Sequence, residues 1–156
     1  MRWPCSFHPR QGAGWAVWLR SSEGRVVRSG RCPSYVQSSN AAELSAIYAG
    51  VFLAVDAWGD RVGSVLVCAD CQGALALAEP SLSPWPAMRR LQEKLRALLE
   101  GRGVALSLRW VRGHQAPSRS TQAYLNGRCD ALARRGRLTG PTRASRGSPS
   151  SRGGAG

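Results

Sequence analysis

The chain has 156 residues, of which 43% are hydrophobic, so its length and composition predict one globular domain with a buried core and exclude a fibrous chain. Its 22 basic and 9 acidic residues give a net charge of +13, which favours a polyanionic partner such as nucleic acid. A coding bias toward arginine is the alternative explanation, because Lys94 is the only lysine.

The first half of the chain predicts paired strands followed by a long helix. Three segments have the residue pattern of strands: residues 14–19, 25–29 and 35–37. A turn at residues 21–24 separates the first two, which predicts a hairpin. Residues 38–40 supply N-cap chemistry for a helix over residues 41–58, where apolar residues recur every three or four positions. Gly59 is the expected C-cap.

The second half predicts an alternation of strands and helices. Its elements are a strand at 64–68, helices at 72–79 and 88–99, a strand at 104–111 and a helix at 123–135. This order predicts an α/β domain over residues 1–135, with helices packed on one mixed sheet. Residues 136–156 consist mainly of Gly, Ser, Pro and Arg and predict a disordered basic tail.

The cysteines and the N-terminus predict a cytoplasmic protein. The five cysteines are scattered, and the Cys68-Cys71 pair has no second ligand pair to complete a zinc site, so we expect free thiols in a reducing compartment. No signal-peptide pattern is present. The longest apolar run, residues 46–55, is about half a membrane span. We therefore expect a soluble monomer without a membrane partner.

Three carboxylates occupy positions that solvation alone does not explain. Glu43 lies in the first turn of an apolar helix, Asp70 follows a buried strand, and Asp130 lies in the arginine-rich last helix. Each has a simpler explanation, which is interaction with the helix dipole, a helix cap and an arginine pair, respectively. Because strand ends and helix starts meet at one edge of an α/β sheet, the three together predict a site for a hard divalent cation.

Four segments resemble type 1 ribonuclease H in the same order. They are residues 38–44 (SSNAAEL), 65–72 (VLVCADCQ), 110–114 (WVRGH) and 126–133 (NGRCDALA). The resemblance covers about residues 4–135 and implies a ribonuclease H-like fold, with a mixed five-stranded sheet and helices on both faces. It also implies an endonuclease that hydrolyses the RNA strand of RNA–DNA hybrids by a two-metal mechanism.

The resemblance implies a role for each candidate residue. Those implied as catalytic metal ligands are Glu43, Asp70 and Asp130. They would hold Mg²⁺, with Mn²⁺ as a substitute. His114 would transfer a proton or aid product release, and its alternative is an ordinary loop histidine. Asn40 and Gln72 would contact the minor groove of the hybrid, where the RNA 2′-hydroxyls lie.

The chain departs from the family at its first strand. The family has a catalytic aspartate there, and Pro4 stands at its position. No carboxylate occurs before Glu23, and the neutral imidazole of His8 is a poor ligand for Mg²⁺. Proline also lacks the N–H that a central strand needs. We therefore expect weak or absent activity, unless the first residues of the natural protein differ from these.

Two other functions stay open. One is a catalytically inactive module of the same fold, which would hold RNA–DNA hybrid or double-stranded RNA on arginine-rich surfaces. The other is a generic α/β domain whose carboxylates are caps and surface charges.

Overall fold

The computed structural model describes residues 5–8, 10, 12–112 and 121–138, without the side chains of residues 5–7, 121–123 and 126. The elements are β1 (Cys5–His8), β2 (Gly12–Ser21), β3 (Gly24–Arg31), α1 (Ser39–Trp58), the 3₁₀ turn η1 (Gly59–Arg61), β4 (Ser64–Ala69), α2 (Gln72–Ala78), α3 (Arg89–Arg102), β5 (Ala105–Trp110) and α4 (Thr121–Leu138). The expected alternation of elements is confirmed, but residues 35–37 form no strand.

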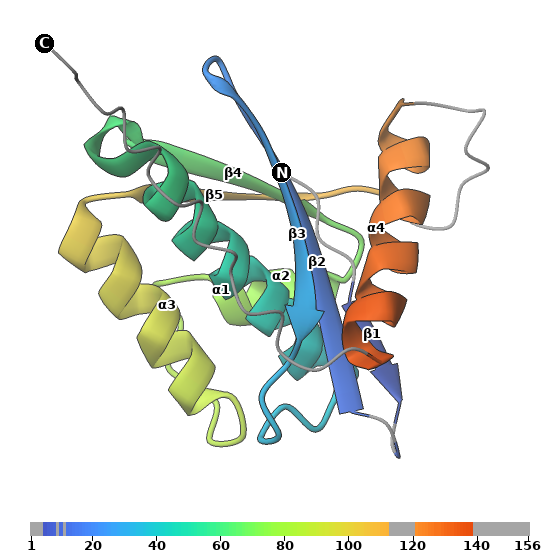
Figure 1. The fold of residues 1–156 in the computed structure, drawn as a ribbon. Coiled ribbons are helices and arrows are strands. Elements are labelled where there is room, and N and C mark those ends of the chain that lie inside the picture. The colour runs from blue at the N-terminus through green and yellow to red at the C-terminus, as the bar shows by residue number, and fades with distance from the viewer. Residues whose placement is uncertain (1–4, 9, 11, 113–120, 139–156) are drawn as a thin grey trace, which may run out of the picture.

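The strands form two sheets rather than the expected single five-stranded sheet (Figure 1). Strands β1, β2 and β3 are antiparallel, with Trp15 opposite Cys5 and Val27 opposite Trp18. Strands β4 and β5 are parallel. Within the described residues, no pairing joins β1 to β4. Strand β1 has 4 residues and follows Pro4, which has no N–H to donate to a neighbouring strand.

Strand β2 separates two hydrophobic layers because its side chains alternate between its faces. Val17 and Leu19 are fully buried in the main core, which α1 covers. Ala16, on the opposite face, packs with Cys129 and Ala133 of α4. Helices therefore cover both faces of the antiparallel sheet, as Figure 1 shows for α1 and α4.

Helix α1 is the central element of the main core. It begins where the backbone N–H of Ala41 donates to the Ser38 hydroxyl at 3.1 Å, and it ends at Gly59, whose φ is 57°. By length and composition alone, the segment Ser39–Arg61 could cross a membrane. In this fold, however, 61% of its most apolar stretch of 18 residues is buried inside the protein. Strands β1 and β2 and helices α2 and α3 contact α1, so it is a core helix here.

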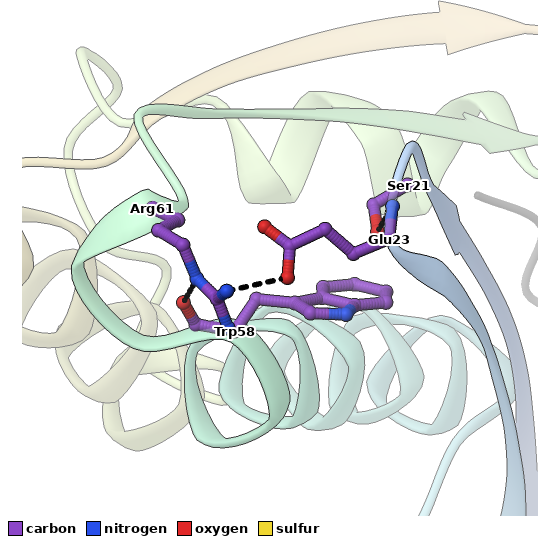
Figure 2. Close-up of polar contacts among 4 residues, drawn as sticks. All are labelled: Ser21, Glu23, Trp58 and Arg61. Carbon is purple, nitrogen blue, oxygen red and sulfur yellow. Dashed lines mark hydrogen bonds and ion pairs between the residues drawn. The ribbon is translucent and has the colours of Figure 1, made fainter.

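The β2–β3 turn is attached to the end of α1 by polar contacts (Figure 2). Arg61 forms an ion pair of 2.7 Å with Glu23 in the turn, and its Nε donates to the carbonyl of Trp58 at 3.2 Å. The backbone N–H of Glu23 donates to the Ser21 hydroxyl at 3.1 Å. Because the two charged side chains are 65% and 38% exposed, we expect the ion pair to contribute less than about 1 kcal/mol.

Glycines allow α4 to lie against the sheet at backbone distance. A Cβ on Gly14 would lie 2.1 Å from the carbonyl oxygen of Ala133, and one on Gly136 would lie 2.7 Å from the carbonyl oxygen of Gly30. Helix α4 continues to Leu138, so the predicted end of the last helix at residue 135 is wrong by three residues. Gly136, expected in a tail, is a buried contact of this helix. The rest of the predicted tail lies outside the described residues.

Candidate functional site

Asp70 occupies the junction between β4 and α2. The indole Nε1 of Trp110 donates to the backbone carbonyl of Asp70 at 3.1 Å, and the N–H of Val111 donates to the carbonyl of Ala69 at 2.9 Å. These bonds fix the ends of β4 and β5 together. The N-cap of α2 is Cys71, so the alternative role of Asp70 as the cap of this helix is wrong.

Asn40 lies beside this junction, and its role in substrate binding stays a prediction. The thiol of Cys71 is within 3.5 Å of the Asn40 side-chain oxygen and donates to it. A Cβ on Gly73 would lie 3.2 Å from the Asn40 amide nitrogen. The start of α2 therefore holds the Asn40 side chain, and the amide nitrogen is the end that can donate to a ligand. Gln72, between Cys71 and Gly73, is exposed.

Glu43 is a buried carboxylate on α1, with 7% of its surface exposed. The helix begins at Ser39, so Glu43 lies in the second turn and not in the first, which weakens its explanation as a helix-dipole residue. It shares a helix face with Asn40, three residues earlier. Burial raises the pKa of the Cys32 thiol to about 11. A hydrogen bond with Ser45 opposes this rise, and the negative charge of Glu43 adds to it.

Asp130 is half-buried on α4, next to the buried Cys129. Helix α4 packs on β2 and β3, so Asp130 comes from the layer opposite α1. His114 and Pro4 lie outside the described residues.

The residues present do not fit a complete two-metal centre. Within the part of the chain that the structure describes, no group of three His, Cys, Asp or Glu side chains could hold a metal ion. The sequence adds no further ligand, because Pro4 has no carboxylate at the position where type 1 ribonuclease H, which the sequence resembles, has its first aspartate. The roles of Glu43, Asp70 and Asp130 as ligands stay predictions.

The sequence did not predict an apolar groove that lies beside Asn40. It encloses about 320 Å³ and is lined by Asn40, Trp85, Met88 and other residues of α2, α3 and the loop between them. The indole of Trp85 is 65% exposed. Gln92 organises this loop, since its side chain accepts from the N–H of Trp85 at 2.8 Å and donates to the carbonyl of Leu77 at 2.9 Å. A lone glutamine in a helix gives no sequence signal for such a role.

Arginines lie close to the same surface. The guanidinium of Arg90 stacks on the ring of Tyr35, with 4.5 Å between its central carbon and the ring centroid. Arg96 donates to the carbonyl of Leu82 at 2.7 Å. Arg89, Arg90 and Lys94 are exposed on α3. The groove that Asn40 lines therefore contains the exposed indole of Trp85, and Arg96 contacts its edge through Leu82.

Four of the 5 cysteines have described side chains, and these form no disulfide: Cys32, Cys68, Cys71 and Cys129. This agrees with the expectation of unpaired cysteines and leaves Cys68 and Cys71 without a disulfide between them.

No family model and no curated protein sequence matches this chain. Solved structures do match. RNase H1 of the archaeon Halobacterium salinarum is 22% identical, with a TM-score of 0.59 over 86% of this chain and 93% of that chain. The N-terminal RNase H domain of a Mycobacterium tuberculosis protein is 18% identical, with a TM-score of 0.57 over 87% and 90%.

A viral enzyme shows the same likeness over part of its length. The protease-reverse transcriptase of prototype foamy virus is 17% identical, with a TM-score of 0.62 over 88% of this chain and 21% of that chain. At these identities the likeness concerns the fold and not the activity. The layered arrangement of strands and helices and the likeness to these solved structures together show that the chain has a ribonuclease H-like fold.

Proposed function

We propose that the chain is a ribonuclease H-type protein that binds RNA–DNA hybrids and hydrolyses their RNA strand at a strongly reduced rate. The observation that supports this most directly is the junction of α1 and α2, where Cys71 holds the Asn40 amide beside Asp70 and Gln72. An amide donor and acceptor at this position suit a minor groove, which displays base edges and RNA 2′-hydroxyls.

The surface around Asn40 has the chemistry of a nucleic-acid interface. Exposed arginines can neutralise backbone phosphates, and the exposed Trp85 offers a flat face for a sugar or a base. Among the solved structures with the same fold is a foamy viral protease-reverse transcriptase in complex with an RNA/DNA hybrid. Both points support a hybrid as the substrate.

The reduced rate follows from the incomplete set of carboxylates. Divalent-metal hydrolysis of a phosphodiester requires ligands that fix the metal ions against the scissile phosphate. Glu43, Asp70 and Asp130 are three candidates, but the described residues form no metal-binding group and Pro4 supplies no fourth ligand. Metal binding should therefore be weak.

A cleavage assay on a labelled RNA–DNA hybrid tests this proposal. We expect slow, divalent-metal-dependent cleavage that Asp70→Asn abolishes. Asp60→Asn is the matched control, because Asp60 is an exposed carboxylate of η1 that the proposal gives no role. Cleavage that survives Asp70→Asn, or that proceeds equally in the presence of a chelator, would contradict the proposal.

The second candidate is a hybrid-binding module without hydrolytic activity. The specific observation in its favour is again that the described residues form no group able to hold a metal. It predicts that the affinity for hybrid is the same with Mg²⁺ and with chelator, falls with salt, and survives Asp70→Asn. Complete absence of product at high enzyme concentration with Mn²⁺, together with retained affinity, would select it over the nuclease.

A further inference from the structure

A second pocket lies on the other side of the antiparallel sheet from α1. It encloses about 420 Å³ between β2, β3 and α4. Its lining is Trp18, Arg25, Val27, Tyr124, Leu125, Arg128, Cys129 and Leu132. The volume falls in the usual range of small-ligand sites, roughly 300–1,000 Å³. None of the candidate residues Asn40, Glu43, Asp70, Gln72 and Asp130 lines it.

The strand side of the pocket combines an apolar surface with positive charge. Trp18 and Val27 are paired residues of β2 and β3, so their side chains stand next to each other on one face. Arg20 and Arg25 form the next pair on the same face and are exposed. The pairing of two arginines across strands is unfavourable on its own and concentrates positive charge at this side of the pocket.

The helix side supplies an aromatic ring and a third guanidinium. Tyr124 and Arg128 are four residues apart on α4, so they share one face. Arg128 Nη1 donates to the Tyr124 hydroxyl at 3.1 Å, with the guanidinium carbon 5.9 Å from the ring centroid. Tyr124 is 48% exposed. The ring and the guanidinium are therefore held together at the edge of the pocket.

The polar groups that line the pocket suit a ligand with an anionic group and a flat ring better than they suit a peptide. Among the described residues, the lining contains no carboxylate and no side-chain amide, and the Tyr124 hydroxyl already accepts from Arg128. A peptide backbone would find few acceptors for its N–H groups there. A nucleotide needs none, since its phosphate accepts from guanidinium groups and its base stacks on aromatic rings.

We propose that the pocket formed by Trp18, Arg25, Tyr124 and Arg128 binds a nucleotide of single-stranded nucleic acid, separately from the hybrid-binding surface. The base lies against the aromatic rings, and the phosphate lies at the two arginines. The positive charge of the whole chain complements this ligand. The inference goes beyond the proposed function and does not depend on hybrid cleavage, because it concerns a different surface and a different ligand.

Fluorescence anisotropy with a short labelled oligothymidylate at low salt tests the base contact. Tyr124→Ala should weaken binding by about tenfold, in line with the loss of one stacking contact, while Tyr124→Phe, which keeps the ring and loses only the hydroxyl that accepts from Arg128, should weaken it less. An abasic strand of equal length should bind weakly and respond little to Tyr124→Ala. Because Tyr124 is half exposed, its replacement should leave the fold intact, which circular dichroism verifies.

The phosphate contact is tested by paired charge removals. Arg25→Gln should weaken binding several-fold more than Arg102→Gln, which removes the same charge from an exposed arginine at the end of α3. Equal effects of these two variants would mean that only net charge matters and would overturn the proposal. An abasic strand that binds as tightly as the oligothymidylate would also overturn it, as would an acidic peptide that displaces the oligothymidylate while binding more tightly.

Discussion

The backbone contact between Gly136 and Gly30 gives the sharpest test of how α4 is docked. Helix α4 contains two glycines in different surroundings. A Cβ on Gly136 would lie 2.7 to 3.0 Å from three backbone atoms of Gly30, while a Cβ on Gly127 would meet nothing within 4 Å. Replacing each of the two glycines by alanine changes helix propensity in the same way, but only the change at Gly136 adds a clash with backbone. Comparing the stabilities of the two variants therefore separates the effect of packing from that of helix propensity.

The expected magnitudes follow from these distances. Replacing a helical glycine by alanine stabilises a helix by up to about 1 kcal/mol, so Gly127→Ala should raise the free energy of unfolding by that amount. Gly136→Ala gains the same helix stabilisation or less. Its added methyl group, however, must displace the backbone of Gly30, and such overpacking lowers the free energy of unfolding by about 1–3 kcal/mol. We expect Gly136→Ala to be less stable than Gly127→Ala by about 1–3 kcal/mol, or about 2–4 °C in Tm for each kcal/mol.

Urea denaturation followed by tryptophan fluorescence measures both variants against the parent protein. Gly14→Ala extends the series, because its Cβ would lie 2.1 Å from the Ala133 carbonyl oxygen, and it should be the least stable of the three. If Gly136→Ala and Gly127→Ala were equally stable, α4 would not pack on β3 as described, and the placement of Asp130 on this layer would be wrong.

Three further predictions concern single side chains. Burial raises the pKa of the Cys32 thiol from 9.0 to about 11, so the stability from its neutral form is complete below pH 9 and is lost as the pH rises through 11. Urea titrations across that window should show the free energy of unfolding of the parent falling by about 2–3 kcal/mol relative to Cys32→Ala, and parallel curves would contradict this. Asn40→Ala should weaken binding to RNA–DNA hybrid more than to duplex DNA in an anisotropy assay, since the proposed function assigns its amide to the 2′-hydroxyls, and an equal loss on both duplexes would refute that role. Arg61→Ala removes an exposed ion pair and should lower the free energy of unfolding by less than about 1 kcal/mol, whereas a larger loss would show that the contact in Figure 2 is better shielded than its exposure indicates.

Local patterns in the sequence predicted most of the elements. The recurrence of apolar residues at three and four positions marked α1, and Ser38 and Gly59 marked its two ends. The order of strands and helices and the position of Asp70 directly after a buried strand were also visible in the sequence, because both depend on neighbouring residues. These features placed the candidate site at the junction of β4 and α2.

Features that depend on contacts between distant segments were not predictable. Asn40 and Cys71 are 31 residues apart, and neither residue type indicates from the sequence that the two side chains form a hydrogen bond. The function of Gly136 depends on how closely α4 approaches Gly30, which composition cannot show, so this residue was assigned to a tail. The division into two sheets likewise depends on which strands pair with β1, and among the described strands β1 pairs only with β2.

The most direct test of the account concerns the ligand that Pro4 fails to supply. Rates of RNA-strand cleavage in Mg²⁺ should be measured for the parent chain, Pro4→Asp and Pro4→Asn on the same RNA–DNA hybrid. We predict that Pro4→Asp raises the cleavage rate by at least about tenfold. Removing a residue that only hydrogen-bonds to a metal ligand already lowers the activity of a metal site by about tenfold or more, so restoring a ligand should have at least this effect. Pro4→Asn lacks the negative charge and should give little gain. Equal rates for the Asp and Asn variants would contradict the claim that an incomplete set of carboxylates limits this protein.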